Sequence, residues 1–310
     1  MWSVACILKT IFIKKFVKAI KNPKKVILFL EKKGMFNFLP DSMYLKMFYY
    51  LKTNNKLNLK TPISFNEKLQ WLKLHYRNPY YANLVDKYEV RKHVKRTIGE
   101  EYLIPLLGVY DTFEEIDFDK LPNQFVLKCT HDSGGLVICH DKSQLNIKRA
   151  KKKINKCLRR NYYYLGREWV YKDINPRIVC ESLMVDESGV ELKDYKFFCF
   201  SGEPKIIQVD FSRFTNHKRN FYNLEWDLLD LSIKYPNDPN TKIIKPDKLE
   251  EMIKLASKLS SDYPHVRVDF YYIKGQIYFG EITFFHGSGY ESFQPEKYND
   301  LLGSWIKLPD

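Results

Sequence analysis

The stretch VRVDFYYIKGQIYFGEITFFHGSG, residues 266–289, decides the fold of this chain. Two runs rich in Val, Ile, Phe and Tyr flank Lys274 and Gly275, and this pattern predicts a β-hairpin. Because side chains alternate between the two faces of a strand, Arg267 and Asp269 share one face of the first strand. The hairpin therefore predicts a sheet with one apolar face and one face that carries charges.

The turn decides which residue of the second strand lies opposite Asp269. A two-residue turn places Gly280 there and turns Glu281 to the other face, whereas a three-residue loop places Glu281 there. Directly opposed Cβ atoms lie only about 5 Å apart, so two bare carboxylates would repel each other. A hard cation such as Mg²⁺ between them removes the repulsion. The alternatives are a metal site at Asp269 and Glu281 and a surface hairpin with solvated acids, and the apolar neighbours of both acids favour the metal site.

The composition is that of a globular protein with an anionic partner. The chain has 310 residues, 45% of them hydrophobic, and a net charge of +14. Such a charge indicates nucleic acid, an anionic membrane or a phosphorylated small molecule as the partner. No helix-turn-helix, zinc-finger or RNP-like pattern is present, which argues against nucleic acid. The six cysteines form no CxxC pair, so we expect reduced thiols in a cytoplasmic protein and neither disulfides nor zinc ligands.

The N-terminal segment, residues 1–33, is basic and amphipathic. Its apolar run is too short and too interrupted to span a bilayer. It is either a helix that lies on an anionic inner leaflet or a helix that packs against the next lobe. Beyond it, Ser64 and Glu67 form a capping-box pattern at the start of a helix. Further helical patterns follow, and the predicted helices cover residues 41–54, 65–75, 81–97, 146–164 and 246–259.

A glycine-rich loop, THDSGG at residues 130–135, joins two predicted strands at 125–129 and 136–139. The GKS/T signature and the helix of a Walker loop do not follow it. The loop is therefore either the tip of a common surface hairpin or a tip that folds over phosphate groups. In the second case Lys128, near the end of the first strand, supplies a positive charge.

The second half of the chain reads as a larger antiparallel lobe. Strands are predicted at 177–181, which ends in Glu181, at 193–200 and at 205–209. Asp194 and Lys196 share one strand face because they are two residues apart. A polar loop at 211–222 holds several cations, which are solvated on a surface but can clamp phosphate or carboxylate in a cleft. The order of elements predicts an α+β protein with a basic helical region over 1–60, linker helices and a small lobe over 61–180, and a large lobe over 181–310.

Taken together, these patterns resemble the ATP-grasp superfamily, and most closely its TupA-like branch of teichuronopeptide biosynthesis, which is often labelled glycosyltransferase. The blocks that carry the resemblance run from about residue 62 to the C-terminus, and they are FNEKLQWLKL, FVLKCTHDSGG, LKDYKFFCFSGEPK, RFTNHKRNFY and GEITFFHGSG. The resemblance implies an ATP-grasp fold, in which two α+β lobes with antiparallel sheets clamp ATP. The helical N-terminal region precedes these lobes.

The resemblance also implies a set of site residues. Asp269 and Glu281 correspond to the carboxylates that hold Mg²⁺, while Thr283 departs from the family, since many members carry Asn there. Glu181 lies at the adenine hinge and Asp194 at the ribose hydroxyls. The remaining implied contacts to the nucleotide and its phosphates are Lys87, Lys128, Ser133, Gly134, Gly135 and Lys196.

The predicted function is that of an ADP-forming carboxylate–amine ligase that works through an acyl phosphate. Arg267, Arg213 and Lys218 would bind the acid or the acyl phosphate. The expected substrates are a hexuronic or amino acid and an amine acceptor on a surface polysaccharide or its precursor. The alternatives are a nucleotide-sugar-dependent glycosyltransferase and an inactive scaffold at the membrane, and the intact carboxylate pair argues against the scaffold.

Overall fold

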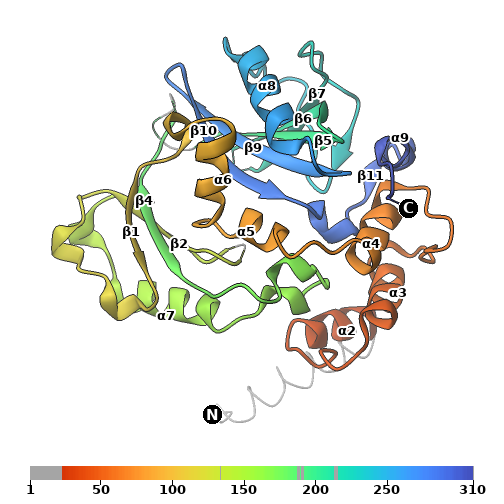
Figure 1. Ribbon diagram of the computed structural model, residues 1–310, viewed down its shortest axis with the longest axis horizontal. Helices are drawn as coiled ribbons and strands as arrows, with labels where there is room; N and C mark the ends of the chain where they lie inside the picture. Colours follow the sequence, from red (N-terminus) through yellow and green to blue (C-terminus); the bar gives the residue numbers. More distant parts are fainter. Residues whose placement is uncertain (1–22, 133, 187–188, 190–191, 213–215, 310) are drawn as a thin grey trace, which may run out of the picture. The chain divides into compact units, whose positions relative to one another are not determined.

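The computed structural model describes residues 23–132, 134–186, 189, 192–212 and 216–309 (Figure 1). Ser133, Arg213 and the first 22 residues of the predicted N-terminal segment lie outside the described residues. The chain forms two compact units, Met1–Leu57 with Tyr164–Arg167, and Asn58–Tyr163 with Glu168–Asp310.

The first unit is built from two helices, α2 (Pro23–Glu31) and α3 (Asp41–Thr53). The buried Glu31 accepts a 2.5 Å hydrogen bond from the Tyr44 hydroxyl and pairs with the Lys52 ammonium at 2.6 Å. Arg167, only 1% exposed, donates to the Leu39 carbonyl at 3.0 Å. These buried polar contacts join the two helices to the short segment 164–167.

The second unit contains the remaining elements. Helix α4 begins with the predicted capping box, because Ser64 accepts from the Glu67 N–H and the Glu67 carboxylate accepts from the Ser64 N–H. The α-helices of this unit are α4 (Phe65–His75), α5 (Tyr81–Val85), α6 (Val90–Thr97), α7 (Ile147–Leu158), α8 (Leu249–Ser260) and α9 (Lys297–Trp305). Its strands are β1 (Leu106–Tyr110), β2 (Phe125–Cys129), β3 (Leu136–Cys139), β4 (Ile178–Ser182), β5 (Asp194–Phe200), β6 (Glu203–Phe211), β7 (Lys218–Tyr222), β8 (Ser232–Ile233), β9 (Val266–Ile273), β10 (Gln276–Thr283) and β11 (Phe293–Gln294).

The single helix predicted over residues 81–97 is wrong, because the chain breaks it into α5 and α6. The cause is Asp86, which ends α5 in an extended conformation. Its Oδ1 accepts from the backbone N–H groups of Tyr88 and Glu89, at 2.8 and 2.9 Å. A short acidic side chain thus satisfies N–H groups that a continuous helix would have used.

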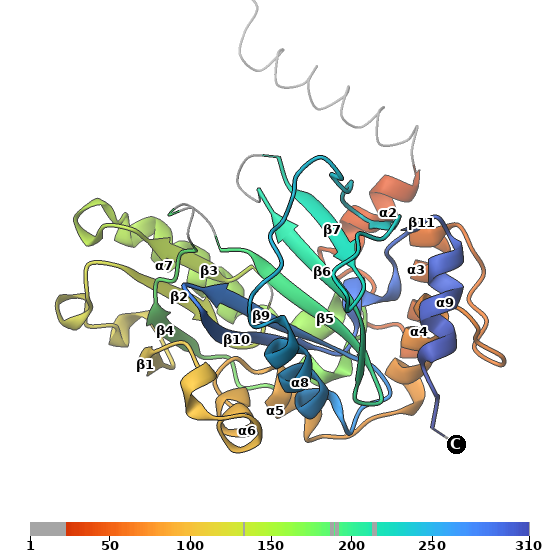
Figure 2. The same cartoon turned by 90° about the horizontal axis from the view of Figure 1, so that it is seen from above.

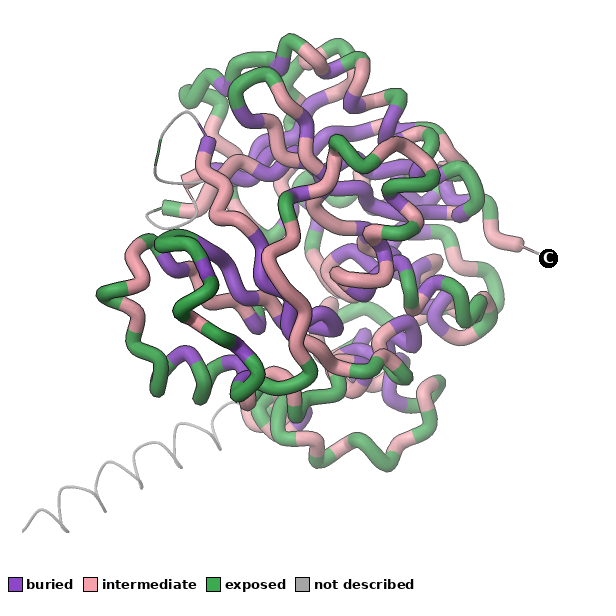
Figure 3. The backbone as a smooth tube through the Cα atoms, turned by 60° about the vertical axis from the view of Figure 1, so that its left-hand side comes forward, coloured by how far each residue is buried: buried purple, intermediate pink, exposed green. Residues whose placement is uncertain are grey.

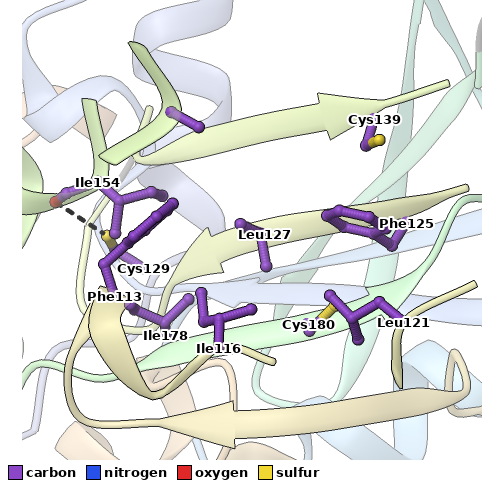
Figure 4. Packing of buried hydrophobic residues seen from close by; sticks show 11 residues of the cluster. Phe113, Ile116, Leu121, Phe125, Leu127, Cys129, Cys139, Ile154, Ile178 and Cys180 are labelled. Atoms are coloured by element: carbon purple, nitrogen blue, oxygen red, sulfur yellow. Dashed lines mark hydrogen bonds between the residues drawn. The ribbon is translucent and has the colours of Figure 1, made fainter. Parts of the chain in front are cut away.

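The small lobe is an antiparallel sheet in the order β1-β4-β2-β3. One face of it packs against α7, where Ala150 and Ile154 join the apolar cluster of the strands (Figure 4). The predicted strands at 125–129 and 136–139 are confirmed as β2 and β3. Because β2 ends at Cys129, the glycine-rich loop emerges at the end of the sheet next to Lys128.

The large lobe is a five-stranded antiparallel sheet in the order β10-β9-β5-β6-β7. Phe197, Val268 and Phe270 point to one face, which the apolar side of α8 covers. Figure 2 shows this sheet beside the four-stranded one. Most residues of β2, β4, β5, β6 and β9 are buried, and Figure 3 shows buried stretches of the backbone in purple. The second half of the predicted polar loop 211–222 is in fact β7, whose Arg219 is buried opposite Asp210 of β6.

The central hairpin has the two-residue turn but the pairing of the longer loop. Ile273 pairs with Gln276, so the turn is Lys274-Gly275, yet Asp269 pairs with Glu281 and Arg267 with Thr283. A β-bulge between Phe279 and Glu281 supplies the extra residue. That residue is Gly280, and a Cβ there would lie 3.1 Å from the Asp269 carbonyl oxygen. The bulge therefore brings both acids to the same position across the two strands.

Candidate functional site

A pocket of about 270 Å³ lies between the two sheets of the second unit. Both lobes contribute to its wall, and charged groups of both signs face it. The small lobe and the helices before it supply Lys87, Val90, Arg91, Leu103, Ile104, Lys128, Cys129, Asp132, Gly134, Gly135, Leu136 and Glu181, and the large lobe supplies Asp194, Lys196, Asp269, Tyr271, Phe279, Gly280 and Glu281.

On the small-lobe side, the buried carboxylate of Glu181 contacts two cations. Lys128 of β2 contacts its Oε2 at 2.7 Å, and Arg91 of α6 contacts its Oε1 at 3.3 Å. The strands that carry Lys128 and Glu181 are neighbours in the sheet, so the contact follows from the antiparallel pairing. The Lys128 side chain remains 23% exposed, which leaves its ammonium open to a ligand in the pocket.

The glycine-rich loop is tied to the sheet at its base. The Cys129 N–H donates to the Gly135 carbonyl at 2.8 Å, and the Gly135 N–H donates to Asp132 Oδ1 at 3.1 Å. Lys87 Nζ donates to the Asp132 carbonyl at 2.6 Å. Gly134 has φ +107°, a conformation that favours glycine, with open space where a Cβ would be. Lys87, Gly134 and Gly135 are therefore gathered at one end of the pocket.

On the large-lobe side, a row of charged residues crosses the sheet. Glu281, Asp269 and Lys196 are successive partners across β10, β9 and β5. Lys196 Nζ contacts Asp269 Oδ2 and lies 3.4 Å from Asp194 Oδ2. Asp194 and Lys196 thus share one face, as their spacing predicts, and this face is the one turned toward the pocket.

Arg267 lies two residues before Asp269 on the same face of β9 and contacts both acids. Its Nε and Nη2 donate to Asp269 at 2.7 Å, and the same Nη2 donates to Glu281 Oε1 at 2.8 Å and to Thr283 Oγ1 at 3.1 Å. Its Nη1 donates to His286 Nδ1 at 2.8 Å. Burial disfavours the charged guanidinium, but Asp269 and Glu281 outweigh it and raise the pKa of Arg267. Arg267 is 8% exposed and not among the described residues that line the pocket, so these contacts favour a positioning role over the predicted contact with the acid.

Glu281 is the more accessible of the two acids, with 45% of its side chain exposed against 1% for Asp269. Burial by the surrounding protein favours the neutral carboxyl group, but the positive charges of Arg267, Lys196 and Lys87 outweigh burial and lower the pKa of Glu281. The carboxylate is therefore ionised at neutral pH. Among the described residues, none donates a hydrogen bond to its Oε2, so this oxygen can accept a cation from the pocket.

The predicted cation cluster at 211–222 does not act as one group. The side chains of His217 and Arg219 turn inward to Asp210, with contacts of 3.0 and 2.8 Å to its Oδ1. Lys218, the first residue of β7, lies between them in the sequence and is absent from the described lining of the pocket. Arg219 therefore neutralises this buried acid, and His217 is a second hydrogen-bond partner of it.

The loop Gly287-Ser288-Gly289, which follows the central hairpin, is held in place by helix α4. Its three residues have left-handed backbone conformations, and none belongs to the described pocket wall. Gln70 Nε2 donates to the Gly289 carbonyl at 2.8 Å, and the fully buried Lys73 donates to the Ser288 carbonyl at 2.8 Å. The side chains of helix α4 thus anchor the backbone of this loop.

Sequence reasoning missed Arg91, Asp132 and Asp210. Arg91 is one of several cations in a basic helix, and nothing in the local pattern distinguishes it. Asp132 stands in the glycine-rich loop, where a side chain that folds back onto a loop N–H is a common device. Asp210 comes directly before Phe211 at the end of an apolar strand, and a buried acid there could have suggested a cation on the neighbouring strand.

Comparison with known proteins gives one family match. The family model described as TupA-like ATPgrasp matches residues 67–307. No curated protein matches the sequence. Solved structures with a low similarity include an L-amino acid ligase from Bacillus licheniformis, with 14% identity, a TM-score of 0.44 and coverage of 79% of this chain and 56% of that one. Another is a D-alanine–D-alanine ligase from Bacillus anthracis, with 17% identity, a TM-score of 0.37 and coverage of 64% and 53%. The chain thus spans about half the length of these proteins.

Proposed function

Since the chain belongs to the TupA-like ATP-grasp family, we propose that it is an ATP-dependent carboxylate–amine ligase whose pocket binds ATP with Mg²⁺. The observation that carries the proposal is the composition of one pocket. Lys87 and Lys128 of the small lobe face Asp269 and Glu281 of the large lobe across it. Cations opposite a carboxylate pair suit a polyphosphate whose own charge is bridged to the acids by a divalent ion.

The nucleotide roles that we propose are those that the family resemblance implies, and the positions of the described lining residues support them. Lys87 and Lys128 bind phosphate oxygens, together with the N–H groups of Gly134 and Gly135 and, as the resemblance implies, of Ser133, which lies outside the described residues. Glu181 faces the base, Asp194 accepts from the ribose hydroxyls, and Lys196 completes the set of polar contacts. The apolar side chains of Leu103, Ile104, Leu136 and Phe279 provide the surface on which a flat aromatic base can lie.

Asp269 and Glu281 fit a magnesium ion by their chemistry. Mg²⁺ prefers carboxylate oxygens, keeps several waters, and takes one or two carboxylates together with phosphates. Glu281 offers the accessible oxygen, while the buried carboxylate of Asp269 forms ion pairs with Arg267 and Lys196. When bound, the ion would supply Lewis-acid stabilisation for the charge on the phosphate oxygens. The Thr283 hydroxyl accepts a hydrogen bond from Arg267 and donates one to Glu281, so we do not include Thr283 among the proposed metal ligands.

The reaction that we propose has two steps. An oxygen of the substrate carboxylate attacks the γ-phosphorus of ATP, ADP leaves, and an acyl phosphate forms. The substrate amine then attacks the acyl carbon, loses a proton, and expels inorganic phosphate as the amide forms. Lys87 and Lys128 hold the charge that moves onto the phosphate oxygens, because phosphoryl transfer is catalysed mainly by positioning and electrostatics.

The acid is a hexuronic or amino acid, and the amine acceptor belongs to a surface polysaccharide or its precursor. The resemblance to the teichuronopeptide branch supports this choice. Lys218 and Arg213 remain our candidates for the acid, since His217 and Arg219 are committed to Asp210. Because ATP is the co-substrate, the reaction takes place in the cytoplasm.

The products test this reaction. Purified protein is incubated with Mg-ATP, one uronic or amino acid and one amine, and nucleotides, phosphate and organic products are measured together. We expect ADP, phosphate and an amide in equal amounts. AMP with pyrophosphate would contradict the proposal, because an acyl adenylate requires attack at the α-phosphorus, away from the lysines and the carboxylate pair.

Lys128→Met is expected to weaken Mg-ATP binding about 10- to 150-fold, since a hydrogen bond to a charged group contributes about 1.5–3 kcal/mol. Glu181 retains Arg91 as its partner, so the lobe should stay folded. Isothermal titration measures the dissociation constant. Lys120→Met, at a lysine whose side chain is 84% exposed, is the matched control and should bind Mg-ATP as the wild type does. Equal affinity in both variants would remove Lys128 from the site.

We also propose a peripheral contact between the N-terminal region, residues 1–33, and an anionic membrane. Among the described residues, no helix has the length and apolar character needed to cross a bilayer. The first unit nevertheless contains Lys32 and Lys33 and exposes four large apolar side chains, Phe29, Met35, Phe38 and Met43, each at least 58% exposed.

Deletion of residues 1–22 together with Phe38→Ser should weaken binding to liposomes of anionic lipid and leave ATP turnover unchanged. The deletion stops before α2 because Glu31 is a buried partner of Tyr44. Co-sedimentation with liposomes of neutral lipid provides the background. Unchanged binding to anionic liposomes would favour the interpretation of this segment as an ordinary packed helix.

A further inference from the structure

Three side chains outside the proposed catalytic set converge behind the glycine-rich loop. Cys129 ends β2, Asp132 lies in the loop, and Cys157 lies in the last turn of α7. Their sulfur and carboxylate oxygen atoms all lie within 4.8 Å of one another. Cys129 and Asp132 are buried, at 1% and 3% exposure, while Cys157 is partly exposed.

The carboxylate of this cluster is incompletely satisfied. Asp132 Oδ1 accepts from the Gly135 N–H, and the Cys157 thiol is a weak donor to this carboxylate. Among the described residues no N–H or O–H group donates to Oδ2, which is shielded from solvent. A buried carboxylate oxygen whose partner is at most a thiol is poorly stabilised, which indicates that a cation would be favoured beside it. Burial and then the charge of Asp132 raise the pKa of Cys129 to about 12, and burial, the charge of Asp132 and a hydrogen bond to Asp132 raise the pKa of Cys157. Both thiols are therefore protonated at neutral pH as long as no cation lies between them.

The fold holds the two sulfurs in place. Cys129 Sγ lies 3.8 Å from the Ile154 carbonyl, one turn before Cys157 on the same side of α7 (Figure 4). His131 Nε2 lies 3.2 Å from the Cys157 carbonyl and 3.0 Å from the Arg160 carbonyl. Since both partners are acceptors, this nitrogen carries the proton and donates to both. The end of α7 is thereby fixed against the loop that carries Asp132.

We propose that Cys129, Asp132 and Cys157 form a binding site for a thiophilic metal ion of the Zn²⁺ class. Two thiolates and one carboxylate are three of the four ligands of a tetrahedral zinc site, and water takes the open position. With Zn–S bonds of about 2.3 Å the two sulfurs lie about 3.8 Å apart, within the span of the cluster. On binding, the two thiol protons pass to solvent and the ion replaces them.

The site is separate from the proposed magnesium site and its existence does not depend on the ligase reaction. Its softer ligands select against Mg²⁺, as the oxygen ligands of Asp269 and Glu281 select for it. The position of the proposed zinc site nevertheless links it to the pocket. Cys129 and Asp132 belong to the pocket wall, and Lys87 donates to the Asp132 carbonyl. A bound ion therefore fixes the base of the glycine-rich loop against α7.

The test is a titration of the full-length, tag-free chain, purified with a phosphine reductant, with Zn²⁺ alone. We expect one tightly bound Zn²⁺ per chain by equilibrium dialysis and elemental analysis. With Cd²⁺ in its place, the ultraviolet charge-transfer absorption of cadmium–thiolate bonds should appear with the same stoichiometry. Cys157→Ala and Asp132→Asn should each weaken binding at least tenfold, and Cys157→Ala should also reduce the cadmium band.

Cys139→Ala is the matched control, because Cys139 is a buried thiol of the same lobe outside the cluster. It should bind Zn²⁺ as the wild type does. Asp132→Asn keeps an oxygen for the Gly135 N–H, so a folding defect is not expected, and circular dichroism of each variant checks this. The proposal is overturned if the wild type binds no stoichiometric Zn²⁺, or if Cys157→Ala binds it as tightly as Cys139→Ala.

Discussion

Glu281→Gln should lower the rate of ADP release by at least about 10²–10³-fold while the protein remains folded. The substitution keeps the shape of the side chain and leaves an oxygen for the 2.8 Å hydrogen bond from Arg267. It removes the negative charge of the accessible member of the carboxylate pair, which we propose as a ligand of Mg²⁺. Initial rates with saturating Mg-ATP, acid and amine measure the effect, and urea unfolding shows whether the fold is intact.

Glu250→Gln is the control for this variant. Glu250 is exposed in the first turn of α8, the helix that covers the opposite, apolar face of the same sheet. Its amide variant should turn over at the wild-type rate. If Glu281→Gln also turned over at that rate, Glu281 would have no part in the reaction and the metal assignment would fail.

Arg267→Met is expected to cause the largest loss of stability, about 3 kcal/mol or more in the free energy of unfolding. The guanidinium neutralises Asp269, which is 1% exposed, and also contacts Glu281 and His286. Methionine fills much of the space but leaves a buried carboxylate with Lys196 as its remaining cation. Removing one partner of a buried ion pair is costly because the other charge stays in a poorly solvated place.

The matched control is Lys205→Met, which breaks a surface pair with Glu203 whose side chains are 37% and 69% exposed. Pairs of this kind contribute at most about 1 kcal/mol. Urea unfolding of the two variants and the wild type gives both losses. Similar small losses in the two variants would show that Arg267 does not support the carboxylates in the way that its contacts indicate.

Local sequence patterns were sufficient for the elements that carry the site. The alternation of apolar and charged residues at 266–273 and 194–197 predicts both strands and the face on which Asp269 and Lys196 lie. The strand before the glycine-rich loop is predicted by its run of apolar residues, and Lys128 is found at its end. The family resemblance is confirmed by the match over residues 67–307.

The register of the central hairpin could not be predicted from the length of its turn. Turn length alone offered two pairings for Asp269, and the chain takes the shorter turn with the pairing of the longer one. Gly280 makes this possible because it occupies the bulge, where a side chain would approach the Asp269 carbonyl. A glycine inside a strand pattern is itself a signal for a bulge.

Contacts between distant parts of the chain could not be predicted. Arg219 looked like a solvated cation because its partner, Asp210, lies on the neighbouring strand. In the same way, Cys129 and Cys157 are far apart in the sequence and lack the close spacing of a zinc motif. The packing of α7 on the sheet brings them together, and only the folded chain shows this.

The central claim is that the pocket binds ATP with a divalent ion, and its most direct test is the melting temperature with different nucleotides. A ligand that binds only the folded state raises the melting temperature in proportion to the logarithm of its concentration above Kd. At about 100 times Kd, we expect ATP with Mg²⁺ to raise it by about 5 °C. ATP without Mg²⁺ and UDP-glucose with Mg²⁺ should have little effect. A rise with UDP-glucose and none with Mg-ATP would contradict the account and favour a nucleotide-sugar-dependent glycosyltransferase.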